Sequence, residues 1–163
     1  MYKNPILIFI VFTAVIIVVA VIFRPAPAEQ QSAVSSSSAL SSDSTYYDFG
    51  SISMANGEVA YEFKVKNVTD QKVEIGKMYT SCMCTVAWFI KGEINKGPFG
   101  MPGHGYVPPV KESLNSGEEA VIKVVFDPNA HGPAGIGKIQ RSIFIESDGS
   151  KSLELQISAS VTP

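Results

Sequence analysis

The segment Val59-Ala60-Tyr61-Glu62-Phe63-Lys64-Val65-Lys66 alternates large apolar residues with small or charged ones. Successive side chains of an extended strand point to opposite faces, so one face of this segment is apolar and the other is suited to water. The segment Leu153-Glu154-Leu155-Gln156-Ile157-Ser158-Ala159-Ser160-Val161 repeats the pattern near the C-terminus. Both segments are therefore predicted to be half-buried β-strands.

Five weaker segments are also predicted to form strands, each closed by a turn signal: residues 46–52, 73–80, 85–90, 120–127 and 138–147. Asp148-Gly149 precedes the last strand, and both residues tolerate the positive φ of a tight turn, so the last two strands should pair as an antiparallel hairpin. Seven short strands without a convincing helical segment predict an all-β fold, an immunoglobulin-like β-sandwich, over residues 46–163.

Gly92 to Gly117 interrupts this pattern with many glycines and prolines, among them Gly97-Pro98-Phe99-Gly100-Met101-Pro102-Gly103-His104-Gly105. Proline lacks the N–H group that a strand needs inside a sheet, so residues 92–117 are predicted to be one long loop. Ordered loops of this length usually carry function. Its apolar and histidine side chains are candidates for binding a partner protein: Phe99, Met101, His104 and Tyr106.

The N-terminal residues 1–23 contain an apolar run from Ile6 to Phe23 whose only hydroxyl belongs to Thr13. As a helix this run would span about 27 Å, close to the thickness of a bilayer's hydrocarbon core. Lys3 with the free amino terminus outweighs Arg24 on the other side, which favours a cytoplasmic N-terminus. We therefore predict a single-pass anchor in the cytoplasmic membrane, with the C-terminal domain outside.

A cleaved signal peptide is the alternative, because Ala26-Pro27-Ala28 resembles a cleavage site, but the apolar run is longer than a usual signal peptide core. The following residues 24–45 are rich in serine and contain prolines at 25 and 27. They are predicted to be a flexible linker. The net charge of −2, without any block of basic residues, argues against nucleic acid as a partner.

The domain sequence resembles the bacterial Ig-like domain-of-unknown-function 1573 family. Five short motifs carry the resemblance: Tyr47-Asp48-Phe49-Gly50, Phe63 with Asn67, Ser81-Cys82-Met83-Cys84-Thr85, Ser116-Gly117-Glu118 and Phe126-Asp127-Pro128. Met83 stands where the Ser-Cys-x-Cys-Thr signature of the family usually has glycine. The resemblance implies an immunoglobulin-like sandwich that is often exported and anchored, and it implies no reaction.

Cys82 and Cys84 are the only cysteines of the chain and form a Cys-x-Cys motif. In an extended strand their side chains would lie parallel with Cα atoms about 6.6 Å apart, so a disulfide between them needs a sharp turn and would be easily reduced. Buried free thiols are the plainer interpretation. A soft metal such as copper, bound by Cys82 and Cys84 with Met101 and His104, is a third interpretation.

No catalytic motif is recognised: the sequence has no Gly-x-Ser-x-Gly, no His-Glu-x-x-His and no phosphate-binding glycine-rich loop. His131, the other histidine, lies among small residues like His104. We therefore expect a membrane-anchored, extracytoplasmic module that binds a protein or associates with the envelope, without catalytic residues or cofactor. The alternative expectation is a copper-binding or thiol-redox site at Cys82 and Cys84.

Overall fold

The computed structural model describes residues 38–148 and 150–163. The predicted anchor at residues 1–23, and most of the predicted linker, lie outside the described residues. Among the residues that are described, no helix is long and apolar enough to cross a membrane.

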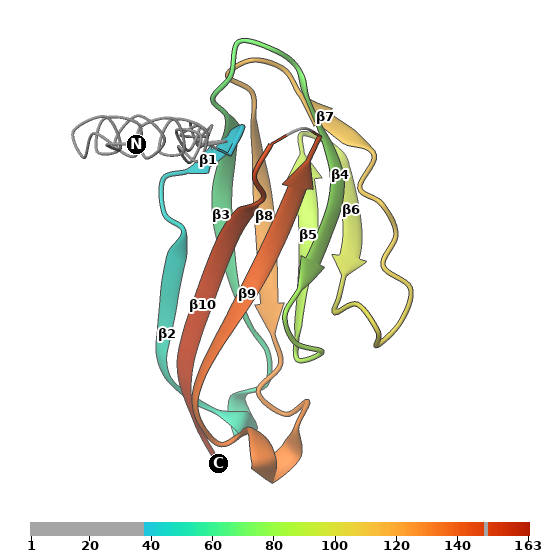
Figure 1. Ribbon diagram of the computed structural model, residues 1–163. Helices are drawn as coiled ribbons and strands as arrows, with labels where there is room; N and C mark the ends of the chain where they lie inside the picture. Colours follow the sequence, from blue (N-terminus) through green and yellow to red (C-terminus); the bar gives the residue numbers. More distant parts are fainter. Residues whose placement is uncertain (1–37, 149) are drawn as a thin grey trace, which may run out of the picture. The chain divides into compact units, whose positions relative to one another are not determined.

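Two five-stranded sheets face each other in the described domain (Figure 1). The strand order of the first sheet is β1 (Leu40–Ser42), β3 (Val59–Asn67), β8 (Glu119–Phe126), β5 (Thr85–Lys91), β6 (Ile94–Phe99). The order of the second sheet is β2 (Tyr46–Ser53), β10 (Leu153–Thr162), β9 (Gly137–Ser147), β4 (Val73–Thr80), β7 (Glu112–Leu114). Neighbouring strands are antiparallel, except that β2 runs parallel to β10. The prediction of an all-β sandwich is confirmed.

The alternation seen in the sequence becomes the two faces of each sheet. In β3, Phe63 and Val65 are buried while Lys64 and Lys66 are exposed. In β10, every second residue from Leu153 to Val161 is buried between the sheets. Each large apolar side chain buried in this way stabilises the fold by about 1.5–3 kcal/mol before the entropy cost of ordering it. The alternation therefore determines which side chains form the core between the two sheets. The loops lie at the two ends of the sandwich.

Seven of the ten strands lie where the sequence predicts them, and the last two pair antiparallel as expected, with Leu153 opposite Ile145. Strand β1 lies inside the predicted linker, which therefore ends earlier than residue 45. Ala39 and Leu40 are both buried and β1 pairs with β3, so two apolar residues among serines bind this segment to the sheet edge.

The predicted loop at residues 92–117 is too long, because it contains strands β6 and β7 and leaves residues 100–111 as its longest remaining loop. Strand β6 tolerates Pro98 because it lies at the edge of its sheet. Gly97 has a φ of 144°, and a Cβ atom there would lie 2.8 Å from Trp88 Cδ1. Phe99 is 1 % exposed and belongs to the core, so its predicted role in partner binding is wrong.

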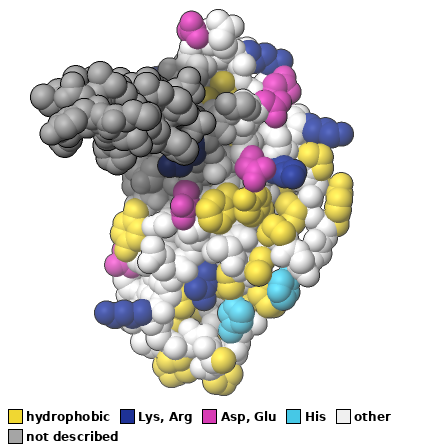
Figure 2. Space-filling model, in the orientation of Figure 1, with side chains coloured by type: hydrophobic (Ala, Val, Ile, Leu, Met, Phe, Trp, Pro, Cys, Tyr) yellow, Lys and Arg dark blue, Asp and Glu magenta, His cyan; other side chains and the backbone are white. Residues whose placement is uncertain are grey.

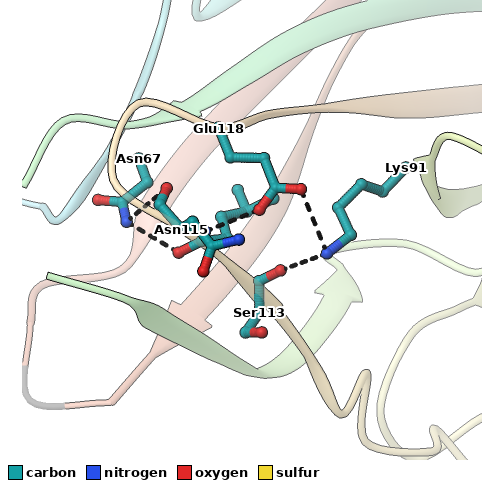
Figure 3. A network of polar contacts seen from close by, with 6 residues as sticks. Asn67, Lys91, Ser113, Asn115 and Glu118 are labelled. Carbon is teal, nitrogen blue, oxygen red and sulfur yellow. Dashed lines mark hydrogen bonds and ion pairs between the residues drawn. The ribbon is translucent and has the colours of Figure 1, made fainter.

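A network of polar contacts joins the loops at the end of the sandwich where β3 meets β4 (Figures 1 and 3). The amide nitrogen of the fully buried Asn67 donates to the carbonyl oxygens of Gln71, Leu114 and Asn115, at 2.7–3.1 Å. Glu118 accepts a hydrogen bond from the backbone N–H of Asn115 at 2.8 Å. These contacts fix the loops that flank β7 and β8.

Candidate functional site

Cys82 and Cys84 lie in the tight turn that joins β4 to β5, at the opposite end of the sandwich from the Asn67 network (Figure 1). The backbone N–H of Thr85 donates to the carbonyl of Cys82 at 3.1 Å, which closes the turn. The Thr80 hydroxyl lies 3.0 Å from that carbonyl oxygen and 2.8 Å from the carbonyl oxygen of Thr85. The cysteines are thus not in the extended conformation that keeps their sulfurs apart.

The turn folds the backbone over the first sulfur. The N–H of Cys84 donates to Cys82 Sγ at 3.4 Å, and both thiols are free. Cys84 is buried at 3 % exposure, whereas Cys82 is half-buried and its neighbour Met83 is exposed. The two sulfurs therefore lie side by side with unequal access to solvent.

His131 and Arg141 complete the group from two other segments. His131 Nε2 lies 3.1 Å from Cys82 Sγ, and Arg141 Nε donates to Cys84 Sγ at 3.2 Å. In the part of the chain that is described, one group of three potential ligand residues has its donor atoms within 4.8 Å of one another: Cys82, Cys84 and His131. We call these three residues, with Arg141, the thiol site.

The loop that carries His131 is held against the turn by backbone contacts. The N–H of Asp127 donates to the carbonyl of Cys84 at 2.9 Å, directly after β8. Further along the loop, the Cα of Gly135 approaches His131 so closely that a Cβ atom would lie 3.3 Å from the His131 Cβ. Arg141 extends from β9, on the face of that strand that also carries Ile139 and Ile143. The site is therefore assembled by three segments of the fold.

The environment of Cys82 favours its thiolate. Partial burial alone would raise its pKa, but hydrogen bonds from Cys84 and His131 together outweigh that effect. The positive charge of Arg141 adds to them, and the pKa of Cys82 falls to about 7. This value places the titration of Cys82 near physiological pH.

The environment of Cys84 favours the protonated thiol. Burial raises the pKa of Cys84, and the hydrogen bond that Cys84 shares with Cys82 raises it further, against the opposing hydrogen bond from Arg141. The two thiols titrate as a pair, in which the first proton leaves Cys82 and the second stays on Cys84. The site thus pairs an accessible nucleophile with a buried, protonated thiol.

The structure brings together only part of the predicted site. Cys82 and Cys84 converge as the metal and redox interpretations require, but His131 lies beside them in place of His104, which is outside the group of donor atoms within 4.8 Å. Met101, His104 and Tyr106 lie in the loop at residues 100–111, where Met101 is half-buried and the other two are exposed. Arg141 was not predicted from the sequence. The pattern that could have identified it is a single charged residue between the apolar residues on one face of the predicted strand.

Comparison with known proteins supports the family and the fold. The model of the family described as "Protein of unknown function (DUF1573)" matches residues 40–101, which confirms the family resemblance seen in the sequence. The match begins with β1 and includes the turn that carries Cys82 and Cys84. No curated protein matches the chain.

Solved structures share the fold at low sequence identity. A protein of unknown function from Porphyromonas gingivalis W83 has a TM-score of 0.54 and 13 % identity, over 81 % of this chain and 51 % of that chain. A family 123 glycoside hydrolase from Clostridium perfringens has a TM-score of 0.51 and 9 % identity, over 72 % of this chain and 22 % of that chain. This chain therefore spans about half of the first protein, and the likeness is one of fold alone.

Proposed function

We propose that this protein is a binding module that exchanges thiols and disulfides with a partner protein outside the cytoplasmic membrane. The observation that carries the proposal is the geometry of the thiol site: two sulfurs and an imidazole within 4.8 Å of one another, with one sulfur accessible and the other buried. An accessible thiolate attacks a disulfide, and a second thiol beside it resolves the product.

In the first step the Cys82 thiolate attacks one sulfur of a partner disulfide R–S–S–R′. A Cys82–S–S–R mixed disulfide forms, and R′–S⁻ leaves. Cys84 then gives its proton to R′–S⁻, and its sulfur attacks Cys82 Sγ, so that R–S⁻ leaves and a Cys82–Cys84 disulfide remains. Two electrons pass from the two cysteines to the partner, whose disulfide becomes one thiol and one thiolate. The reverse sequence oxidises a partner dithiol.

His131 and Arg141 have separate parts in this chemistry. Nε2–H of His131 donates to the Cys82 thiolate across the 3.1 Å contact and favours the attacking species. The Arg141 Nε–H already points at Cys84 Sγ and stabilises the negative charge that appears there when Cys84 loses its proton. Neither residue is itself oxidised or reduced.

The turn conformation suits a reactive disulfide better than a structural one. A bond between two cysteines separated by one residue closes a very small ring, so deviation from ideal disulfide geometry raises its reduction potential. Such a bond forms and breaks readily, as exchange requires.

Copper binding, the other chemistry considered for these cysteines, is less favoured by the local charge. The guanidinium of Arg141 lies 3.2 Å from Cys84 Sγ, so the buried sulfur already has a cationic partner. A metal cation between the sulfurs would have to compete with that guanidinium for Cys84 Sγ.

The experiment that tests the proposal equilibrates the full-length protein, in a mild detergent, with glutathione buffers of graded redox potential. Free thiols are then trapped with a maleimide and counted by intact mass. We expect a reversible transition between two free thiols and none, and accumulation of a glutathione adduct at Cys82 in Cys84→Ser. Two labelled thiols at every potential, or copper retained by the purified protein, would refute the proposal.

The proposed location outside the cytoplasmic membrane is supported by the sequence, in which a serine-rich segment follows the apolar run at residues 6–23. An anchor there would hold the domain in a compartment where disulfides form and persist. Intact mass of the protein recovered from the membrane fraction should show residues 1–28 retained, whereas a mature chain that begins after Ala28 would indicate cleavage.

A further inference from the structure

The loop at residues 100–111 forms an arch over the edge of β4. Its first residue is bound to the strand by the N–H of Thr80, which donates to the carbonyl of Gly100 at 3.1 Å. Its far end is bound by the N–H of Val110, which donates to the carbonyl of Gly76 at 2.9 Å. Between these two contacts the loop leaves β4, and a cavity of about 510 Å³ remains. Its main lining residues are Lys77, Tyr79, Pro102, Tyr106, Val107 and Glu146, and we call it the arch groove.

Two tyrosines line the arch groove, Tyr79 from β4 and Tyr106 from the loop. Tyr79 stacks on Phe144 of β9, with ring centroids 5.2 Å apart and an interplanar angle of 29°. Tyr106, on the opposite wall, is 86 % exposed, the most exposed of the large apolar side chains in the described residues. Figure 2 shows hydrophobic side chains gathered on this face of the molecule, close to histidine side chains. An exposed aromatic group of this kind marks an interaction surface.

The charges of the arch groove are balanced. Lys77 and Glu146 face each other across the β4–β9 pair, and the Tyr79 hydroxyl donates to Glu146 Oε1 at 3.1 Å. One cation and one anion do not favour a polyanion or a polycation. They do suit the alternating N–H and C=O groups of a polypeptide backbone, while tyrosine and proline walls suit an extended chain.

The arch groove lies on the outer face of β4, and its Tyr79 precedes Cys82 by three residues in the chain. Tyr79 and Ser81 lie on the same outer face of the chain, about 6.6 Å apart along a strand. The pairing with β9 continues to Ser81, because the N–H of Ser81 donates to the carbonyl of Ser142 at 2.9 Å. Cys82 is the next residue. A chain that lies in the groove and follows β4 therefore reaches the accessible sulfur within about two to four residues.

We propose that the arch groove binds an extended, apolar segment of the partner polypeptide and presents a nearby partner sulfur to Cys82. This inference rests on the proposed exchange function and adds to it a determinant of specificity. Tyr79 and Tyr106 hold the segment between them, and the sulfur to be attacked lies two to four residues from the residue held in the groove.

The test uses full-length Cys84→Ser protein, in which the mixed disulfide at Cys82 persists. The probe is a library of random decapeptides, each with one cysteine activated as a 2-thiopyridyl disulfide. The Cys82 thiolate attacks the peptide sulfur and releases 2-thiopyridone. Trapped peptides are released by reduction and sequenced by mass spectrometry. We expect enrichment of aromatic and aliphatic residues two to four positions from the cysteine, on one side only.

Tyr106→Ala should abolish this enrichment and slow the reaction of an enriched peptide about tenfold. It should leave the reaction with hydroxyethyl disulfide, which is too small to fill the groove, within twofold of the parent rate. Tyr46→Ala is the matched control, because Tyr46 is another exposed tyrosine on the distant strand β2. Trapped peptides with the composition of the input library would overturn the groove assignment. Failure of Cys82 to react even with hydroxyethyl disulfide would overturn the exchange function itself, and the groove assignment with it.

Discussion

The two ends of the sandwich both gather polar side chains, but they use them differently. At one end Asn67 gives its amide hydrogens to three backbone carbonyls (Figure 3). Its amide oxygen accepts from the N–H and hydroxyl of Thr69. At the other end the side chain of Cys82 forms hydrogen bonds with the side chains of His131 and Cys84. The first set of contacts fixes the backbone, and the second adjusts a reactive group.

This difference predicts which property each substitution changes, the stability of the fold at the Asn67 end or the reactivity of the thiol at the Cys82 end. A buried amide that satisfies backbone groups contributes to stability, because its loss leaves those groups without partners in a place that water cannot reach. A half-buried sulfur contributes little packing, but its chemistry depends on charges and donors nearby. Substitutions at the two ends should therefore change different measurements.

Cys82→Ser should have the largest effect. Serine is not ionised near neutral pH, so the rate of mixed-disulfide formation should fall by about a thousandfold or more, while the free energy of unfolding changes by less than about 1 kcal/mol. Thiol–disulfide kinetics and urea denaturation of the same sample measure both quantities. A large loss of stability would show that the two ends do not differ as described.

Asn67→Ala should give the converse result. Three carbonyl oxygens lose their donor, and we expect the free energy of unfolding to fall by about 2–4 kcal/mol. The pH at which Cys82 becomes reactive should stay the same in the folded protein. Gln140→Ala, at an exposed position, serves as the control and should change stability by less than about 0.5 kcal/mol. A shift in Cys82 reactivity on Asn67→Ala would contradict the independence of the two ends.

Arg141→Met should raise the pKa of Cys82, because it removes a positive charge that favours the thiolate. Arg141→Lys keeps the charge and should restore most of the shift. Iodoacetamide alkylation of Cys82 as a function of pH, followed by peptide mass spectrometry, measures the change. Equal titration curves for the Met and Lys variants would assign the effect of Arg141 to packing.

Gly135→Ala should have the smallest effect. The new Cβ atom would lie 3.3 Å from the Cβ of His131 and 3.4 Å from the carbonyl oxygen of Pro128, so the loop must shift by a few tenths of an ångström. The contact between His131 and Cys82 should lengthen, and the pKa of Cys82 should rise, by less than it does in His131→Gln. The same alkylation series measures both variants, and a larger shift for Gly135→Ala than for His131→Gln would be inconsistent with this contact.

The fold was largely predictable from the sequence because the alternation in segments such as Val59 to Val65 directly reflects which side chains are buried. Strands β1, β6 and β7 were missed because serines, glycine and proline hide the pattern of the first two and β7 has only three residues, and edge strands need few apolar residues. The thiol site was only half predictable. The Cys-x-Cys motif is local, whereas His131 and Arg141 lie 49 and 57 residues away from the cysteines that they contact.

The most direct test of the difference between the two ends is the pH dependence of Cys82 alkylation in the unmodified protein. The structure predicts that the rate rises with a midpoint near pH 7 and that Cys84 stays unlabelled there until the protein is unfolded. A midpoint near pH 8.5, the ordinary value for a cysteine, or equal labelling of the two thiols, would contradict the account.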